Sequence, residues 1–143
     1  MAKLTEANIA REANSSSFER GYSYYQDGYV LEITQRGEQL TAEVEGSGYR
    51  PYQVQVTVQS GKIVSANCSC PYDWGGYCKH IVATLLHYIH EPSTIERQTP
   101  LTTLLADLTA EQLKQLIIQV AAENLDFVRA IERERQWTKV LPT

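Results

Sequence analysis

The sequence predicts an α+β fold, in which a small antiparallel sheet of about four strands leads through a short loop into a helix, followed by a C-terminal helical segment. Three observations support this prediction. Between residues 29 and 67, apolar and polar side chains alternate along short runs that are separated by glycine-containing turns. All three cysteines of the chain follow within residues 68–78. Beyond residue 80, apolar residues recur at helical spacing.

The segment before the sheet predicts two helices. Residues 4–13 carry apolar side chains at loose helical spacing, which indicates a short helix. Ser16 followed by Glu19 is a capping-box pattern, so a second helix is expected to start there and to end at Gly28. Three aromatic side chains fall at helical intervals along it and are expected to pack on the elements that follow: Phe18, Tyr22 and Tyr25.

Each alternating run has the length of one strand, and the glycine turns between the runs allow tight antiparallel connections. The strands are expected at residues 29–35, 40–44, 52–59 and 63–67. The last of them runs directly into Cys68. The sheet is therefore expected to deliver the first cysteines of the cluster.

The cysteines and His80 are spaced as ligands of one metal ion. Cys68 and Cys70 are one residue apart, and alternate side chains of a strand share a face, so both thiols can point at the same ion. The following loop, residues 71–77, contains a proline and two adjacent glycines, which favour a tight reversal. Cys78 and His80 stand where the helical pattern starts, and the positive end of a helix dipole favours nearby thiolates. Three thiolates and one imidazole make the closed tetrahedral ligand set of a structural zinc ion.

The ligand types favour zinc over other metals. Thiolates and imidazole bind zinc better than they bind oxygen-preferring ions, and iron–sulfur clusters normally need four cysteines, more than this chain has. The spacing within each pair differs from that of common zinc fingers, so ligand identity supports zinc better than spacing does. Two alternatives remain open. One is a set of small buried cysteines in a reduced protein; the other is a redox Cys-x-Cys or a catalytic Cys/His pair, which would need only one thiolate and a base.

The same stretch resembles a known family. The order Cys-x-Cys, an aromatic and glycine loop, then Cys-x-His entering a helix is similar to the SWIM-type zinc finger of bacterial proteins, including the fingers found ahead of helicase-like domains. All four ligand positions are present: Cys68, Cys70, Cys78 and His80. A weaker resemblance extends upstream to Phe18-Glu19-Arg20-Gly21 and Tyr24-Tyr25. The resemblance implies zinc binding and, more loosely, interaction with DNA or protein.

Length and composition set further bounds. With 143 residues, 43% of them hydrophobic, the chain is long enough for one compact domain or for a small domain with a helical extension. The formal charge of −4, with acids and bases mixed along the chain, weighs against strong sequence-independent nucleic-acid binding. No apolar run has the length of a membrane span, and no signal-peptide core follows Met1, so a cytoplasmic protein without a membrane partner is expected. The odd number of clustered cysteines agrees with a reducing compartment.

The C-terminal part predicts a separate helical extension. Pro92 is expected to end the helix that starts at His80. The polar residues 93–100 then predict a linker between a zinc-binding α+β domain, residues 1–92, and helices within residues 101–143. Thr109 is expected to cap one of these helices. Their leucines must pack on the first domain, on each other or on another chain, and the last option allows a dimer.

The sequence predicts a module that is not an enzyme. A zinc ion with four protein ligands has no open position for a substrate or an activated water, so no small-molecule substrate is expected. Gly61-Lys62 lacks the other residues of a phosphate-binding loop, which excludes an ATPase motor of that type in this chain.

Two hypotheses about the partner follow. In the first, the module binds nucleic acid through rings and cations near the zinc, because aromatic rings beside cations can stack unpaired bases. The candidate residues for this surface are Trp74, Lys79, Arg50 and Tyr72. In the second, it is a zinc-stabilised protein–protein adaptor with no nucleic-acid binding of its own. A helicase-like protein is one partner that the resemblance implies.

Overall fold

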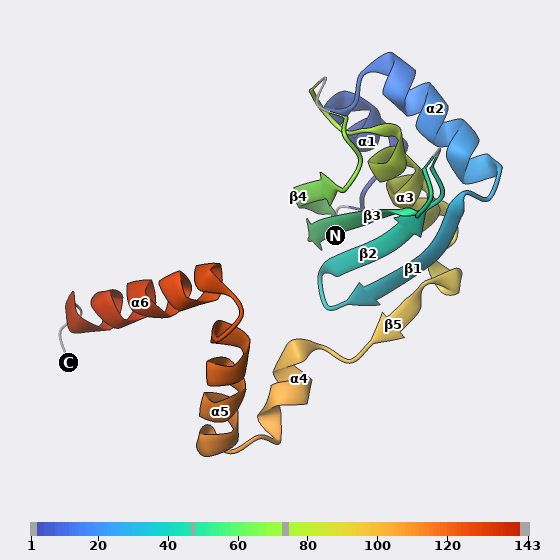
Figure 1. Cartoon of the computed structure of the whole chain (residues 1–143). Helices are drawn as coiled ribbons and strands as arrows, with labels where there is room; N and C mark the ends of the chain where they lie inside the picture. The colour runs from blue at the N-terminus through green and yellow to red at the C-terminus, as the bar shows by residue number, and fades with distance from the viewer. Residues whose placement is uncertain (1–2, 47, 73–74, 141–143) are drawn as a thin grey trace. The chain divides into compact units, whose positions relative to one another are not determined.

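The computed structural model describes residues 3–46, 48–72 and 75–140, with side chains up to residue 136. The chain divides into two compact units, Met1–Pro100 and Leu101–Thr143 (Figure 1). The first combines helices with a sheet, whereas the second is helical. The predicted α+β class is confirmed.

Two short helices open the first unit. The helix α1 (Glu6–Glu12) is capped by Thr5, whose side chain accepts a hydrogen bond from the backbone three residues on. The helix α2 (Ser15–Gln26) does not use the predicted cap at Ser16, because Asn14 occupies the N-cap and accepts the capping bond. Asparagine caps a helix as well as serine does, so the prediction placed the helix start two residues too late.

Five strands form one sheet in the order β4-β3-β2-β1-β5 (Figure 1). The first four pair in antiparallel fashion, as predicted, whereas β5 pairs parallel to β1. The register shifts once between β1 and β2 and once between β3 and β4. The strands are β1 (Val30–Arg36), β2 (Gln39–Val44), β3 (Tyr52–Gln59), β4 (Lys62–Cys68) and β5 (Glu96–Gln98).

The core lies between one face of this sheet and the helix α3 (Lys79–His90). Residues 81–86 of α3 are all buried, because the sheet, α1 and α2 surround this helix. The helices α2 and α3 approach closely at Gly21, where an added Cβ would lie 2.4 Å from Cγ1 of Val82. The sheet contributes alternate side chains of β2 and β3 to the core: Leu40, Ala42, Val44, Val54, Val56 and Val58.

The stretch predicted as a linker, residues 93–100, is partly built into the first unit. Pro92–Thr94 form a 3-10 turn, η1, and β5 follows as a strand beside β1. Ile95, only 6% exposed, joins the core between them. Three polar residues next to a buried isoleucine do not produce an alternating pattern, which is why the sequence does not reveal this strand.

The second unit consists of α4 (Leu101–Ala106), α5 (Ala110–Ala121) and α6 (Leu125–Val140). Thr109 caps α5, as predicted, through a capping box. No residue of α4 or α5 is buried. Within the described ranges, no helix combines the length and apolarity that a bilayer crossing requires. The exposed large apolar side chains of this unit are Leu101, Leu104, Leu105, Leu116, Ile117, Ile118, Val120, Leu125 and Ile131.

Candidate metal centre

Two structural elements bring the predicted ligands together. Cys68 is the last residue of β4, opposite Val54 of β3, and Cys70 follows just after the strand. Cys78 is the N-cap of α3 and His80 lies in its first turn, with 3% and 4% of their surfaces exposed. The ligands thus come from a strand end and a helix start, the placement that the sequence predicts.

The loop between the two ligand pairs is fastened to the N-terminal helices. The amide of Tyr77 donates a 2.9 Å hydrogen bond to the carbonyl of Glu12, at the end of α1. The hydroxyl of Tyr72 accepts a 2.8 Å hydrogen bond from the Asn14 amide group, at the start of α2. Gly76 has a φ of +73°, and a Cβ there would lie 2.6 Å from the Glu12 carbonyl, so only glycine fits this approach. The packing of α1 and α2 therefore helps to position the ligands.

The three sulfurs and one imidazole nitrogen form a single cluster. The ligand atoms all lie within 4.8 Å of one another. Nδ1 of His80 is 3.7 Å from Sγ of Cys68 and 3.8 Å from Sγ of Cys78. Zn–S bonds of about 2.3 Å and Zn–N bonds of about 2.0 Å would place tetrahedral ligand atoms roughly 3.5–3.8 Å apart. The cluster therefore fits a tetrahedral zinc ion after a small closure of its longest separations.

The cluster favours a negative charge on one of its three sulfurs. A hydrogen bond with Cys68 and a further one with His80 lower the pKa of the Cys78 thiol to about 4, against the opposing effect of burial. The hydrogen bond with Cys78, followed by burial, raises the pKa of Cys68, and burial raises that of Cys70. One thiolate therefore forms first and is held by the other two thiols. A bound dication would take the place of these protons, because the thiolate is the metal-binding form.

His80 uses one ring nitrogen for the cluster and leaves the other without a hydrogen-bond partner. Nδ1 faces the sulfurs, whereas Nε2 is buried and makes no hydrogen bond in the part of the chain that the structure describes. The rings of Tyr52 and Tyr24 lie beside the imidazole, with centroids 4.7 Å and 5.7 Å away. When Nδ1 binds a metal, Nε2 carries the proton. It is then a buried donor without an acceptor.

Comparison with known proteins agrees with this geometry. Residues 52–89 match the SWIM zinc finger family, from β3 through all the clustered ligands into α3. The chain contains a SWIM zinc finger. Its cofactor is one structural zinc ion.

The chain is also similar in sequence to part of a much larger protein. The chain is 34% identical over 114 residues to the zinc finger SWIM domain-containing protein 8 homolog of Drosophila melanogaster. This alignment covers 78% of the chain, more than the finger alone, but the chain spans only 5% of that relative's length. No solved structure matches the chain. The likeness therefore concerns the SWIM module and its flanks.

Two of the four predicted interaction residues line one hollow. Lys79 and Tyr72 line the same hollow beside the SWIM cluster, and Nζ of Lys79 lies 4.7 Å from the centre of the Tyr24 ring. Arg50 is exposed but does not line this hollow. Trp74 lies outside the described residues.

Two further residues of the hollow escaped prediction. Arg20 reaches it from α2 and Tyr52 from the start of β3. The only signal for Arg20 was its place in the upstream segment that resembles SWIM proteins. Its position beside the ligands depends on the close packing of α2 on α3 at Gly21, which no local pattern reports.

Proposed function

We propose that this SWIM module binds single-stranded nucleic acid in the hollow beside the metal cluster. The chemistry of the hollow's lining carries the proposal. The hollow has a volume of about 280 Å³ and is lined by residues of α2, β3, the ligand loop and α3. Arg20 and Lys79 line it, and among the described residues no carboxylate does. Among the described residues, a phosphate group would find two cations there and no carboxylate.

The lack of acids is informative because the first unit is acidic. Residues 1–100 contain eight Lys and Arg residues against eleven Asp and Glu residues. The loaded cluster would add three thiolates and one dication, a formal charge of about −1. The two cations exceed this charge, so the hollow is a locally positive site on a negative unit. Such a site attracts phosphate at short range without making the whole protein basic.

The aromatic lining suits an unpaired base. Tyr52 and Tyr72 both line the hollow, and a base stacked on an aromatic ring gains about 1–3 kcal/mol. Tyr72 is held in place by hydrogen bonds from Asn14 and Ser17, so it presents a fixed wall. His80 also lines the hollow and carries the unpartnered Nε2. Rings and cations at this scale fit one nucleotide of a single strand better than a duplex.

Fluorescence anisotropy with the zinc-loaded full chain and a labelled single-stranded oligonucleotide tests this proposal. Two neutralised phosphates predict a salt slope of about −1.4, so the affinity should fall about sevenfold between 50 and 200 mM salt. Arg20→Glu is expected to weaken binding and to flatten this slope. Lys62→Glu is the matched control, because it changes the charge equally on β4, outside the hollow.

The outcome depends on the difference between the two variants. Equal losses for Arg20→Glu and Lys62→Glu would mean that net charge, and not the hollow, determines the affinity. Equal affinity for duplex DNA would likewise contradict a site made for an unpaired base. If binding depends on the hollow, titrations with DNA and with RNA of the same sequence would show whether the module prefers deoxyribose or ribose.

In this proposal zinc shapes the hollow and performs no chemistry. Cys70, Cys78 and His80 belong both to the hollow's lining and to the cluster. A zinc ion with four protein ligands has no free position for a substrate. We therefore propose a docking module that is not an enzyme and that works beside a nucleic-acid enzyme, such as the helicase-like proteins that the sequence resemblance implies.

A second candidate function, protein–protein adaptor, is supported by the C-terminal helices. The helix α5 keeps Leu116, Ile117 and Val120 exposed, although helices of this length are marginal in water without apolar contacts. We propose a second copy of the chain as the partner, because the same exposed apolar side chains of α5 on two copies can pack together about a twofold axis. Sedimentation should then show a dimer that Leu116→Glu dissociates, and a monomer at high concentration would exclude this candidate.

The proposed compartment is the cytoplasm. All three cysteines are free thiols, and the cluster needs them as thiolates to bind zinc. A reducing compartment keeps them in that state. Zinc content that survives purification only with a reductant present would support this location.

A further inference from the structure

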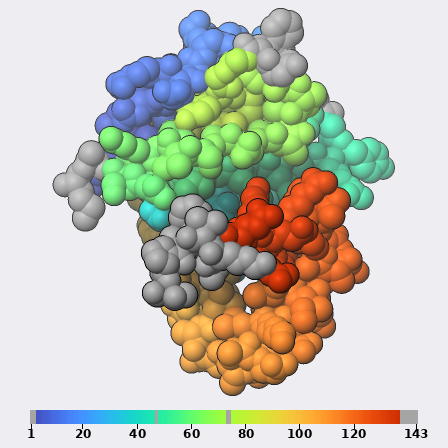
Figure 2. All heavy atoms as spheres, turned by 90° about the vertical axis from the view of Figure 1, so that its left-hand side faces the viewer, coloured from blue at the N-terminus to red at the C-terminus, as the bar shows by residue number. Residues whose placement is uncertain are grey.

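The sheet of the first unit has a free edge at β4. In the described parts of the chain β4 pairs only with β3, so one side of its backbone meets no other strand. This edge faces the viewer in Figure 2, where β4 is green and α1 is blue. The backbone N–H of Ser69 donates a 3.0 Å hydrogen bond to the Gln53 carbonyl. By the alternation of an antiparallel pair, the backbone N–H and C=O groups of residues 67 and 65 also point to β3. By the same alternation, the N–H and C=O groups of Ala66 point to the free edge.

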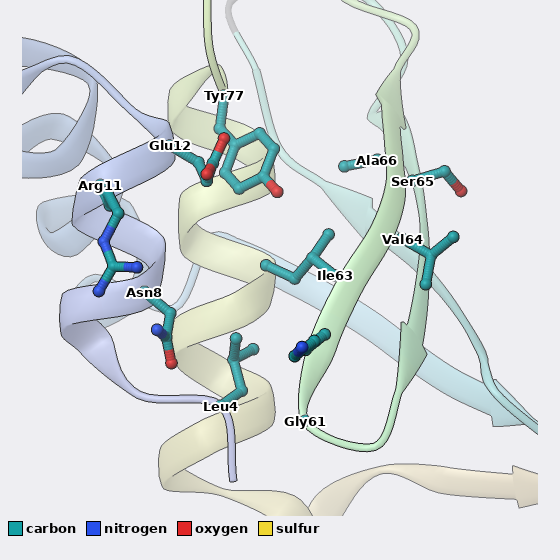
Figure 3. A pocket seen from close by; sticks show the side chains of 11 residues that line it. Leu4, Asn8, Arg11, Glu12, Gly61, Ile63, Val64, Ser65, Ala66 and Tyr77 are labelled. Atoms are coloured by element: carbon teal, nitrogen blue, oxygen red, sulfur yellow. The ribbon is translucent and has the colours of Figure 1, made fainter. Parts of the chain in front are cut away.

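A groove runs between this edge and α1. It has a volume of about 530 Å³, with α1 on one side and β4 on the other (Figure 3). Figure 3 shows Ile63 and Ala66 pointing into the groove, whereas Val64 and Ser65 point away from it. The buried Leu4 also lines it. The groove therefore offers apolar contact to every second side chain of an added strand and solvent to the others.

The charges along the groove are mainly positive. Arg11 and Lys62 line it together with one carboxylate, that of Glu12. A second hollow of about 340 Å³ adjoins the groove, shares two of its lining residues, and adds Lys3 and Arg97 without a carboxylate. No ion pair that involves these four cations is present among the described residues. Four cations against one carboxylate stand out in a unit where acids outnumber bases.

We propose that an extended acidic segment of a partner protein adds to β4 as a further strand of the sheet. Its backbone would pair with β4, its apolar side chains would enter the groove, and its carboxylates would lie beside Lys62 and Arg11. Main-chain bonds supply affinity in this mode, while the groove and the cations supply specificity.

The chemistry of this edge disfavours two competing occupants, a second copy of β4 and nucleic acid. A second copy of β4 would bring the same cations to the edge, and Lys62 and the register shift near Val64 are features that protect an edge against self-pairing. Nucleic acid would leave the free backbone groups and the apolar side chains of the groove unused. The inference does not rest on the nucleic-acid proposal, because the described residues that line the two surfaces do not overlap.

The test uses the zinc-loaded full chain and, as probe, a capped peptide of about eight residues that alternates valine with glutamate, long enough to span β4. In amide NMR spectra, the peptide is expected to shift residues 62–68 and α1. Lys62→Glu should weaken binding about fivefold without changing the zinc content. Arg20→Glu, in the hollow beside the metal cluster and outside the groove, is the charge-matched control and should leave the affinity unchanged. A peptide N-methylated on the alternate amides that would face β4 keeps every side chain but cannot pair, so its binding should be lost.

Several outcomes would overturn the inference. Equal binding of a valine–lysine peptide would contradict recognition by charge. Equal binding of the N-methylated peptide would contradict backbone pairing with β4. Concentration-dependent broadening of β4 resonances without peptide would identify a second copy as the occupant. An oligonucleotide that shifts the same β4 amides would assign the groove to nucleic acid. Lys62→Glu is expected to weaken only peptide binding, and Arg20→Glu only oligonucleotide binding. Failure of this inference is therefore distinguishable from failure of the nucleic-acid proposal.

Discussion

The two units of the chain carry similar apolar patterns but differ in what those patterns bury. In the first unit, Leu85 and Leu86 of α3 have no exposed surface. In the second, α5 shows the same helical spacing, yet Leu116 and Ile117 keep 42% and 40% of their surfaces exposed. Periodicity therefore predicts a helix in both units. A core forms only where a second element offers a complementary face, and in the first unit that element is the sheet.

The first unit itself combines two kinds of stabilisation. Burial of alternate residues of β2 and β3 against α3 holds the sheet to the helix. The described residues between Cys68 and Cys78 include no buried side chain. This loop depends instead on the zinc ion and on hydrogen bonds to α1 and α2. Loss of zinc and loss of an apolar contact should therefore damage different parts of the unit.

Removal of the metal should have the largest effect. Structural zinc contributes on the order of 10 kcal/mol to folding in small domains. Chelation, or Cys70→Ser, is expected to unfold residues 69–77 and the first turn of α3 and to spare much of the sheet. Hydrogen exchange should show protection lost in the loop and retained in β2 and β3. Ser65→Ala, on the exposed side of β4, is the control and should keep its zinc.

The ligand assignment depends on this experiment. A Cys70→Ser variant that retains one equivalent of zinc and wild-type thermal stability would remove Cys70 from the ligand set. Unfolding of the whole first unit on chelation would show that the sheet, too, requires the metal.

Truncation of a leucine should cost much more folding free energy in the first unit than in the second. Leu85→Ala is expected to destabilise the first unit by about 2–5 kcal/mol, because the cavity lies in a closed core. In the monomer, Leu116→Ala should cost less than about 1 kcal/mol, because its side chain is partly exposed and alanine favours the helix as well as leucine does. Urea denaturation followed by circular dichroism measures both. Equal costs would mean that a partner buries α5, and dilution of the sample should then reduce the cost at Leu116.

A substitution at the contact between α2 and α3 should reduce stability by less than Leu85→Ala does. Gly21→Ala would place a Cβ 2.4 Å from Cγ1 of Val82 and 2.9 Å from the Lys79 carbonyl. Such overpacking costs about 1–3 kcal/mol and outweighs the gain of about 1 kcal/mol that alanine brings to a helix. Thermal unfolding should therefore show a lower midpoint for Gly21→Ala and almost no change for Ser23→Ala on the same helix. A stabilised Gly21→Ala protein would contradict the close approach of the two helices.

The smallest expected effect concerns pH. Burial, with an added contribution from Glu12, raises the pKa of Tyr77 above its ordinary value. The folded state thus holds this proton more tightly than the unfolded chain does. The resulting stability is present below pH about 10 and is lost as the pH rises above it. Denaturation between about pH 9 and 11 should show a decline that is slightly shallower in Tyr77→Phe. An identical decline in both proteins would assign it to other tyrosines.

Much of the first unit could be predicted because its local patterns agree with its tertiary structure. The valines of β3 alternate with polar residues along the whole strand, so its bounds were predicted correctly at 52–59. Cys68 and Cys78 cluster because a strand end and a helix start meet across a short loop, and both signals are local. The gathering of the ligand types was therefore visible in the sequence itself.

The rest depends on contacts between distant segments. The strand β5 is stabilised by pairing with β1, more than 60 residues earlier, and its own residues show no alternation. Arg20 lies near Tyr52 only because α2 packs on α3. The groove beside β4 requires α1 and the sheet edge together. None of these features has a periodic pattern, so no local rule could have found them.

The ligands of the metal cluster lie close together in the chain, and this spacing determines when the site can form during folding. Residues 68–80 contain the whole set. A loop of about ten residues closes in roughly 10–100 ns, whereas a β-hairpin forms in about 1–10 μs. The thiols can therefore meet around an ion before the strands have paired. During synthesis, the set is complete once His80 has left the ribosome, before β5 and the C-terminal helices have emerged. A shortage of zinc would thus act first on newly made chains.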